Sequence, residues 1–231
     1  SGASAAMVNE LVYVVGGRTT SGVPGSTFVF DSKTQAWSKR TQQIQPSWNH
    51  MIAVWEGRIY VFGGIAGVGN GRRGLDRVEV YDPKSDRWDR SDSMPAPRSD
   101  AGVVAVDGRL YLIGGRSAPG AGSSSLSSVD VYEFDRKTWS EGPELPEVLT
   151  GCRAAATEDT IYVFGGALGT SGTLSNVVWR LELGSNQWYK ADAELVVGRS
   201  SFCCERVGES IFLLGGVSGI SMPQLNASAV S

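Results

Sequence analysis

Short apolar runs alternate with glycine-rich polar segments along the whole chain, and each run ends at two adjacent glycines. A continuous apolar run of four residues, such as 59–62, is typical of a strand that is buried on both faces. The doublets recur every 47 to 51 residues, and a period of this size indicates one structural unit copied in tandem. The five doublets are Gly16–Gly17, Gly63–Gly64, Gly114–Gly115, Gly165–Gly166 and Gly215–Gly216.

The residues around each doublet predict four antiparallel strands per unit. In the third unit, a strand at 101–106 leads through a tight turn at Asp107-Gly108 into the run before the doublet. A loop rich in Gly, Ser, Thr and Pro then precedes a third strand, and an acidic residue follows. A tryptophan six residues beyond that acid marks a short fourth strand, and these residues are Trp37, Trp88, Trp139 and Trp188. Radial stacking of such sheets protects their edges and buries both faces, so we expect each indole to lie between neighbouring sheets.

The combined landmarks resemble the kelch repeat. In the second unit they are Tyr60, Gly63-Gly64, Tyr81-Asp82 and Trp88. The fourth unit has Leu181-Glu182 at the Tyr-Asp step, and the fifth lacks the tryptophan. The resemblance covers nearly the whole chain and implies an all-β fold, a kelch-type β-propeller of four-stranded antiparallel blades.

We interpret residues 1–231 as a single propeller array, with blades at about 1–40, 47–91, 98–141, 149–191 and 199–231. The last blade is incomplete, which gives four complete blades and part of a fifth. Propellers hold four to eight blades, and the kelch resemblance implies more than five. The chain is therefore interpreted as a fragment of a larger propeller. The alternative is a small propeller with an irregular last blade.

Composition and charge exclude several classes of protein. Hydrophobic residues make up 41% of the chain and charged residues 19%, which is typical of a folded protein. No run is long enough for a membrane helix, and the first residues do not resemble a signal peptide. The net charge of −3 is too small to indicate a nucleic-acid or membrane partner. We expect a cytoplasmic protein with free, buried thiols at Cys152, Cys203 and Cys204.

No catalytic or metal-binding constellation is evident in the sequence. His50 is the only histidine, so a site with several histidines cannot form within this chain, and we expect neither a metal nor a cofactor. A kelch-type enzyme acting on a sugar or small metabolite, similar to sialic-acid epimerases of this architecture, remains an alternative. It would need polar side chains in the central channel, and the candidates are His50, Arg98, Arg153 and Arg199. Binding to actin or the cytoskeleton is a further alternative.

The loops after the doublets are basic although the whole chain is acidic. They carry Arg18, Arg72, Arg73, Arg77 and Arg116 against one acid, Asp76. The resemblance to kelch adaptors implies a peptide-binding face lined by Arg18, Trp48, Asn49, Arg72, Arg73, Ser99, Asp100, Arg116, Ser200 and Ser201. Arginine binds carboxylates in a two-point fashion, which favours an acidic peptide. Alternatively, these arginines are solvated loop charges, and three acids at 141–147 on the same face weaken the basic character.

We therefore predict a non-catalytic protein–protein interaction module with a substrate-recruiting or scaffolding role. Its expected partner is a protein or peptide, and further domains of the same polypeptide are a second possibility. The sequence indicates the scaffold without indicating which protein binds to it, because fold alone does not determine function.

Overall fold

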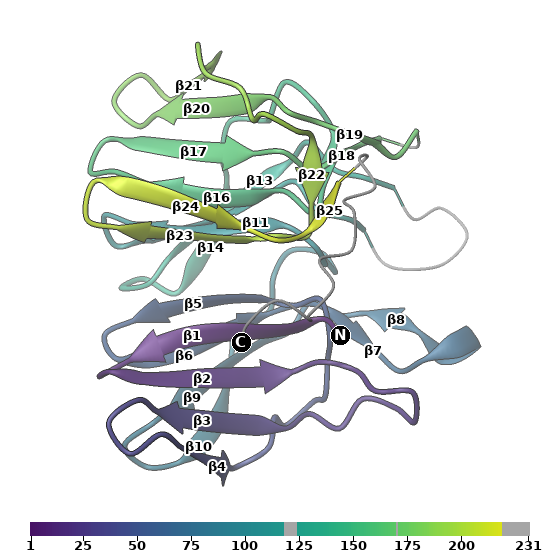
Figure 1. Cartoon of the computed structure of the whole chain (residues 1–231), viewed down its shortest axis with the longest axis vertical. Helices are drawn as coiled ribbons and strands as arrows, with labels where there is room; N and C mark the ends of the chain where they lie inside the picture. Colours follow the sequence, from purple (N-terminus) through teal and green to yellow (C-terminus); the bar gives the residue numbers. More distant parts are fainter. Residues whose placement is uncertain (118–123, 170, 219–231) are drawn as a thin grey trace, which may run out of the picture.

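The computed structural model describes residues 1–117, 124–169 and 171–218. Within these ranges, β-sheets follow one another around a central axis, and each sheet is a simple up-and-down meander (Figure 1). The first two sheets consist of β1 (Ala3–Val8), β2 (Leu11–Gly16), β3 (Thr27–Asp31) and β4 (Ala36–Arg40), then β5 (Met51–Trp55), β6 (Arg58–Phe62), β9 (Val78–Asp82) and β10 (Arg87–Ser91). The next two consist of β11 (Gly102–Val106), β12 (Arg109–Ile113), β13 (Val129–Glu133) and β14 (Thr138–Glu141), then β16 (Arg153–Ala156), β17 (Thr160–Phe164), β20 (Val178–Glu182) and β21 (Gln187–Lys190).

A fifth sheet contains the paired strands β23 (Cys203–Val207) and β24 (Ser210–Leu214). Short strands and one turn of 3-10 helix lie in the loops that follow the glycine doublets. They are β7 (Ile65–Ala66), η1 (Gly69–Gly71), β8 (Arg73–Gly74), β18 (Ala167–Leu168), β19 (Thr173–Leu174) and β25 (Val217–Ser218). Two further short strands, β15 (Leu149–Thr150) and β22 (Arg199–Ser200), lie in the connections that precede blades 4 and 5 and pair with β18 and β25. We call the five main sheets blades 1 to 5. The predicted all-β fold of four-stranded antiparallel blades is confirmed.

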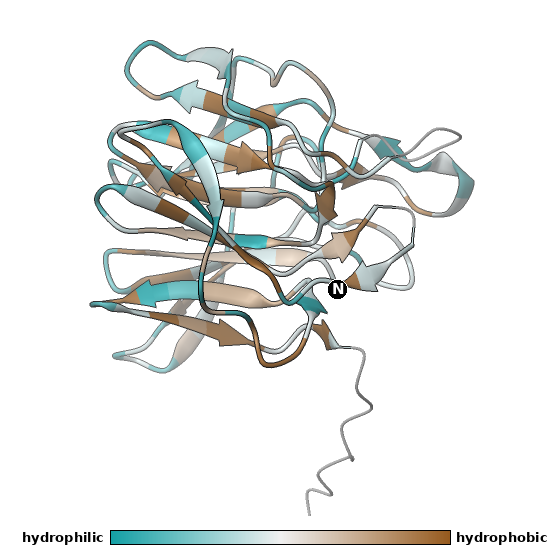
Figure 2. Ribbon diagram, turned by 90° about the horizontal axis from the view of Figure 1, so that it is seen from above, coloured by the Kyte–Doolittle hydropathy of each residue, from teal (hydrophilic) through white to brown (hydrophobic). Residues whose placement is uncertain are grey.

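Neighbouring blades meet through apolar faces. The first strands of successive blades contact one another in the order β1, β5, β11, β16 and β23. We call the side of a blade that meets the preceding blade its leading face, and the opposite side its trailing face. Between blades 1 and 2, Tyr13 and Val15 on a trailing face pack with Tyr81 and Trp88 on a leading face. Figure 2 shows hydrophobic residues along the strands and hydrophilic residues in many of the connecting turns.

One predicted indole is not buried. Trp88 is only 7% exposed, and Trp139 and Trp188 are half-buried, but Trp37 is 59% exposed. The expectation that all four lie between sheets is therefore wrong for Trp37. Its blade has no preceding blade among the described residues, so nothing covers the leading face on which it lies.

The glycine doublets bring the chain close to the next inter-blade connection. Gly63 has φ +56°, and a Cβ there would lie 2.3 Å from the carbonyl oxygen of Arg98. The next amide, that of Gly64, donates to the same carbonyl at 2.8 Å. A side chain at Gly63 would therefore both clash and strain the backbone, which explains why glycine is needed here.

The three cysteines are free thiols in different environments. Cys152 is buried, Cys204 is half-buried and Cys203 is exposed. The expectation of buried thiols is wrong for Cys203, because adjacent residues in a strand point to opposite faces and no blade among the described residues covers its face of blade 5. In the described ranges, no helix is long and apolar enough to cross a lipid bilayer.

Candidate functional site

A chain of backbone hydrogen bonds links the blades at one mouth of the central channel. The amides of Asn49, Asp100, Gly151 and Ser201 donate in turn to the carbonyls of Gly2, Asn49, Asp100 and Gly151, at 2.8, 3.1, 2.8 and 2.8 Å. All five residues have φ between 52° and 73°, in the left-handed region that favours Gly, Asn and Asp. Asn49, Asp100 and Ser201 were predicted as ligand contacts. Their left-handed backbone conformation is a structural reason for short polar residues at this position. The glycines at the equivalent positions 2 and 151 are the sequence signal that could have revealed this backbone requirement.

Asp100 lies at this mouth between polar and cationic groups. Its carboxylate accepts a hydrogen bond from Ser99 Oγ at 3.1 Å. Burial raises the pKa of Asp100, although the Asn49 side chain and the charges of Arg153 and Arg116 oppose this shift. Ser99 itself is only 2% exposed, so its hydroxyl serves Asp100 rather than facing the solvent.

Arg18 stacks on an aromatic ring at the same mouth. Its guanidinium carbon lies 4.5 Å from the ring centroid of Trp48. Trp48 is 7% exposed, and its indole N–H donates to the carbonyl of Gly67 at 3.1 Å. The contact orients the exposed Arg18 before any ligand arrives, because cations are attracted to the face of an indole ring.

Arg116 occupies the same position in its blade as Arg18, immediately after a glycine doublet. Its main chain pairs with that of Ser99, and the amide of Arg18 donates to the carbonyl of Ser1 in the equivalent way. Arg72 and Arg73 are exposed farther out, at the end of the loop between β7 and β8 and at the start of β8. Arg72 Nε donates to the carbonyl of Gly69 at 3.1 Å. At blade 5, Ser200 is half-buried and Ser201 exposed.

Arg77 does not belong to this basic face, contrary to the sequence-based expectation. It is 7% exposed and points between blades, where it donates to Ser47 Oγ at 2.7 Å and lies 3.3 Å from the carboxylate of Glu79. Its pKa is lowered by burial, with Glu79 opposing the shift. The loop face is therefore less basic than the count of arginines indicated.

Two of the four side chains considered for an enzyme's channel are also committed to packing. Arg98 is 4% exposed and donates to the carboxylate of Asp130 at 2.8 Å. His50 is 5% exposed, with Nδ1 3.0 Å from Ser47 Oγ. Arg153 and Arg199 remain half-buried. Across the described part of the chain, no group of three or more His, Cys, Asp or Glu side chains is placed to hold a metal ion.

The buried position of His50 predicts a loss of stability in acid. Burial lowers the pKa of His50 from 6.5 to about 3, and the charge of Arg77 adds to this shift. The imidazole binds a proton more readily in the unfolded chain than in the folded one. The contribution of neutral His50 to the free energy of unfolding is therefore complete above pH 6.5 and is lost as the pH falls toward 3. We expect a slope approaching about 1.4 kcal/mol per pH unit in this window.

Urea denaturation of the wild type and His50→Gln at several pH values tests this expectation. The difference in unfolding free energy between the two proteins should narrow as the pH falls below 6.5, because only the wild type carries this titration. A constant difference between pH 6.5 and 4 would contradict a neutral, buried His50.

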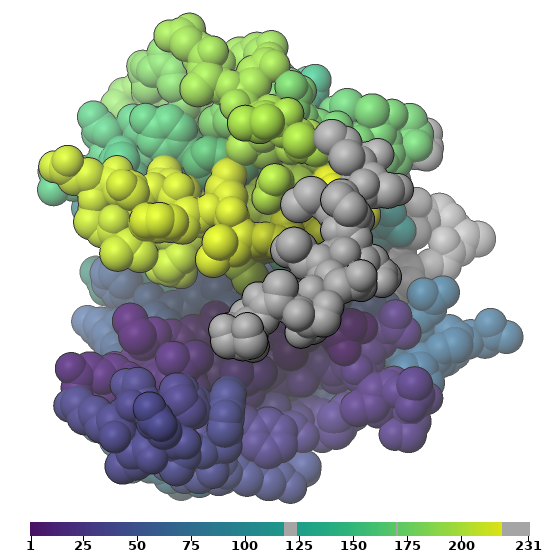
Figure 3. Space-filling view, in the orientation of Figure 1, coloured from purple at the N-terminus to yellow at the C-terminus, as the bar shows by residue number. Residues whose placement is uncertain are grey.

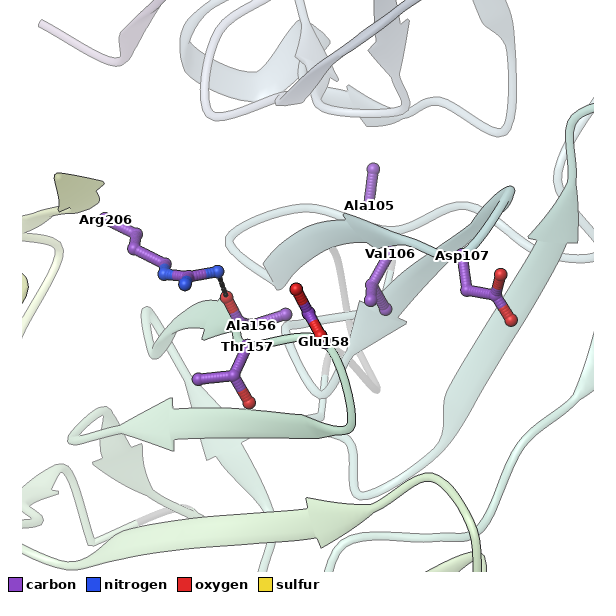
Figure 4. Close-up of a pocket in the computed structure, with 7 residues that line it drawn as sticks. All are labelled: Ala105, Val106, Asp107, Ala156, Thr157, Glu158 and Arg206. Carbon is purple, nitrogen blue, oxygen red and sulfur yellow. Dashed lines mark hydrogen bonds between the residues drawn. The ribbon is translucent and has the colours of Figure 1, made fainter. Parts of the chain in front are cut away.

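The opposite end of the channel contains a shallow hollow of about 390 Å³ (Figure 4). It is lined by the hairpin ends of blades 3, 4 and 5, including Ala105, Asp107, Ala156 and Glu158. Arg206 Nη1 donates to the carbonyl of Ala156 at 3.2 Å across it. This guanidinium is therefore already bonded to backbone carbonyls, since Arg206 Nε also donates to the carbonyl of Gly208.

Comparison with known proteins agrees with this architecture. The model of the KLHDC2/KLHL20/DRC7 Kelch-repeats domain matches residues 2–216. The chain belongs to the kelch-repeat family. Its relatives include Kelch-like protein 25 of Xenopus tropicalis, 29% identical over 94% of this chain and 36% of that protein, and Kelch-like protein 35 of Mus musculus, 31% identical over 82% and 30%.

Beta-scruin of Limulus polyphemus is 26% identical over 84% of this chain and 22% of its own length. This kelch-repeat chain thus spans about a third or less of the length of these three relatives. A solved structure, described as the structure of YjhT, superposes with a TM-score of 0.83 at 19% identity, covering 94% of this chain and 77% of that one. At this identity the likeness shows the fold alone.

Proposed function

We propose that this kelch-repeat chain is a non-catalytic protein-interaction module that binds an acidic peptide segment at the channel mouth. One observation carries the proposal: Arg18 and Arg116 follow their glycine doublets directly, are both exposed, and stand at equivalent positions of two blades. Two such guanidiniums give a carboxylate-bearing ligand two separate points of attachment. The Kelch-like relatives support a substrate-recruiting or scaffolding role in a larger protein.

Further features of the mouth support a peptide ligand. Asn49 and Asp100 offer an amide and a carboxylate near the arginines, so backbone N–H groups of a peptide have an acceptor close to its acidic side chains. Arg72 and Arg73 extend the cationic surface outward from the mouth. We also propose a cytoplasmic location, the kind of compartment in which an exposed thiol such as that of Cys203 stays reduced.

We expect Arg18→Ala and Arg116→Ala each to weaken binding of an acidic peptide by about 10- to 100-fold, because a hydrogen bond to a charged group contributes about 1.5–3 kcal/mol. A peptide array identifies a binder, and fluorescence anisotropy then measures its Kd with the wild type and each variant. Arg87→Ala is the matched control, since Arg87 is exposed on β10 near the opposite end of its blade. Equal Kd values for the wild type, Arg18→Ala and Arg116→Ala would contradict the proposal that the channel mouth binds an acidic peptide.

A further inference from the structure

A second cavity lies between blades 2 and 3 and has a volume of about 260 Å³. On the blade 2 side it is lined by β6, β9 and β10, with Arg58 and Asp82 at the turn ends of their strands. On the blade 3 side it is lined by Tyr132 of β13 and by Lys137 in the turn that follows. Blades 1 and 5 form the near side of the molecule in Figure 3, and blades 2 and 3 lie behind them. Both walls of the cavity are therefore complete four-stranded blades.

At the junction of blades 1 and 2, the carboxylate of Asp86 occupies the equivalent place. Asp86 Oδ1 accepts a hydrogen bond from the Tyr81 hydroxyl at 2.6 Å. It accepts another from the amide of Thr41, in the connection after blade 1, at 3.0 Å. Burial would raise the pKa of Asp86, but these two bonds and the charge of Arg40 outweigh burial and lower it. This junction is thus built around an anion that two donors and a nearby cation stabilise.

Blade 3 carries Lys137 where blade 2 carries Asp86. Both residues precede the tryptophan of their blade by two positions, and their φ angles are 55° and 51°. Tyr132 likewise corresponds to Tyr81, since each pairs with that tryptophan. An ammonium group donates hydrogen bonds and cannot accept them, and the Tyr132 hydroxyl lies 3.2 Å from Ser91 Oγ instead. Blade 3 thus keeps the phenol donor and replaces its anionic acceptor with a cation.

Two further differences between the junctions accompany this exchange. Ser91 ends the fourth strand of blade 2 where Arg40 ends that of blade 1, and the shorter side chain leaves room for the cavity. The indole N–H of Trp139 is buried and has no hydrogen-bond partner among the described residues. The equivalent group of Trp88 donates to the carbonyl of Thr41 at 2.9 Å. The polar contacts that hold blade 2 to the connection before it are therefore not repeated at blade 3 within the described ranges.

The charges around the cavity restrict what fits it. Arg58, Arg90 and Lys137 are exposed cations at its wall, and Asp82 and Asp89 are acids at the same wall. The cations outnumber the acids, which favours an anionic group, while the two carboxylates accept hydrogen bonds from a hydroxyl or ammonium group of the same ligand. The volume of about 260 Å³ is below the usual range of about 300–1,000 Å³ for drug-sized ligands, so the ligand that fits is a small molecule.

We propose that the cavity between blades 2 and 3 binds a small carboxylate that also carries a hydroxyl or ammonium group. Its carboxylate lies between Tyr132 and Lys137, in the place that the Asp86 carboxylate holds one junction earlier. The Tyr132 hydroxyl and the Lys137 ammonium donate to it, and the hydroxyl or ammonium group of the ligand donates to the acids of blade 2. This site lies at the turn ends of the blades, away from the glycine doublets, and does not depend on what the channel mouth binds.

Isothermal titration calorimetry with L-malate and L-aspartate at constant ionic strength tests the proposal. Both acids should bind the wild type saturably. Tyr132→Phe removes one donor and should weaken binding by about tenfold, the effect of losing one hydrogen bond to a charged group. Lys137→Asp should abolish binding, because the introduced carboxylate takes the ligand's place as Asp86 does in blade 2. Aspartate tolerates the left-handed backbone at this position, so we expect the variant to fold.

Two controls separate this site from general charge effects and from the channel mouth. Lys84 is exposed on the corresponding turn of blade 2, so Lys84→Asp makes the same change of charge away from the cavity. Arg18→Ala/Arg116→Ala removes the two cations of the mouth. Both controls should bind L-malate and L-aspartate as the wild type does, so that failure here is distinguishable from failure of the acidic-peptide proposal.

Several results would overturn the proposal. They are the absence of saturable binding by either acid, equal affinity of Lys137→Asp and the wild type, and an equal loss of affinity in Lys84→Asp. Loss of binding in Arg18→Ala/Arg116→Ala would place the acids at the channel mouth instead. Tighter binding of N-acetyl-aspartate N-methylamide than of the free acids would assign the cavity to an acidic side chain of a protein partner, and would also contradict a small-molecule site.

Discussion

Replacement of Trp88 by alanine should lower the free energy of unfolding of the 231-residue chain by about 3–5 kcal/mol, the usual cost of removing a large buried aromatic side chain. Trp88 is 7% exposed, its ring centroid lies 5.0 Å from that of Tyr81, and its indole donates to Thr41 at 2.9 Å. The substitution leaves a cavity between blades 1 and 2 and removes the donor to the Thr41 carbonyl. Urea denaturation followed by far-UV circular dichroism measures the loss.

Trp37→Ala is the matched control for this prediction. The two tryptophans hold the same position in their blades, but Trp37 is 59% exposed. We expect its replacement in the same chain to cost less than about 1 kcal/mol, as for other substitutions at exposed sites. Equal losses at the two positions would mean that the indoles stabilise each sheet from within instead of joining neighbouring blades.

Arg98→Leu should be comparably damaging, at about 3–5 kcal/mol, because it leaves a buried carboxylate without its cation. The Arg98 guanidinium donates to the carbonyls of Gly114 and Ser128, to Ser128 Oγ and to Asp130, all at 2.8 to 2.9 Å. Asp130 is itself only 8% exposed. Its pKa is already raised by burial, with Arg98 opposing the shift, so loss of the guanidinium leaves the charged carboxylate unfavourable.

The double variant Arg98→Leu/Asp130→Leu should recover much of this loss, because a buried ion pair is often replaceable by apolar side chains. Blade 4 provides the precedent: Leu149, 1% exposed, stands at the position of Arg98, and Trp179 at that of Asp130. Arg109→Leu is the control, since this arginine is about half exposed and pairs with Glu133 at 3.5 Å, which predicts an effect below about 1 kcal/mol. A double variant no more stable than Arg98→Leu would show that Arg98 stabilises the fold mainly through its hydrogen bonds to the carbonyls of Gly114 and Ser128.

The two buried arginines show where reasoning from sequence reaches its limit. In blade 3 the guanidinium comes from Arg98 and bonds to Ser128, whereas in blade 2 it comes from Arg77 and bonds to Ser47. Arg77 and Ser128 hold equivalent positions in their blades, since Gly63 and Gly114 donate to their carbonyls in the same way. Arginine and serine are thus exchanged between this position and that of Ser47 and Arg98. A guanidinium reaches the same space from either strand, and loop residues counted one by one do not reveal this. Arg77 was therefore assigned to the solvent-exposed face.

The residues of the channel mouth had a similar ambiguity. Asn49, Asp100 and Ser201 were selected because they are polar and follow the pattern of kelch adaptors, and they do lie together at one mouth. The left-handed backbone there selects for small polar residues and glycine whether or not a ligand binds. Arg18 and Arg116 have no such backbone requirement, so the functional proposal rests mainly on these two residues.

The sequence by itself determined the repeat, the strands and the kind of fold. Doublets such as Gly63–Gly64, the apolar runs before them and the spaced tryptophans are local signals, and local backbone preferences and alternation are enough to specify each blade. Only the tertiary structure decided which of the equivalent side chains are covered. Trp37 and Trp88 hold the same position in their repeats, six residues after an aspartate. Their burial depends on the neighbouring sheet, and only Trp88 has one among the described residues.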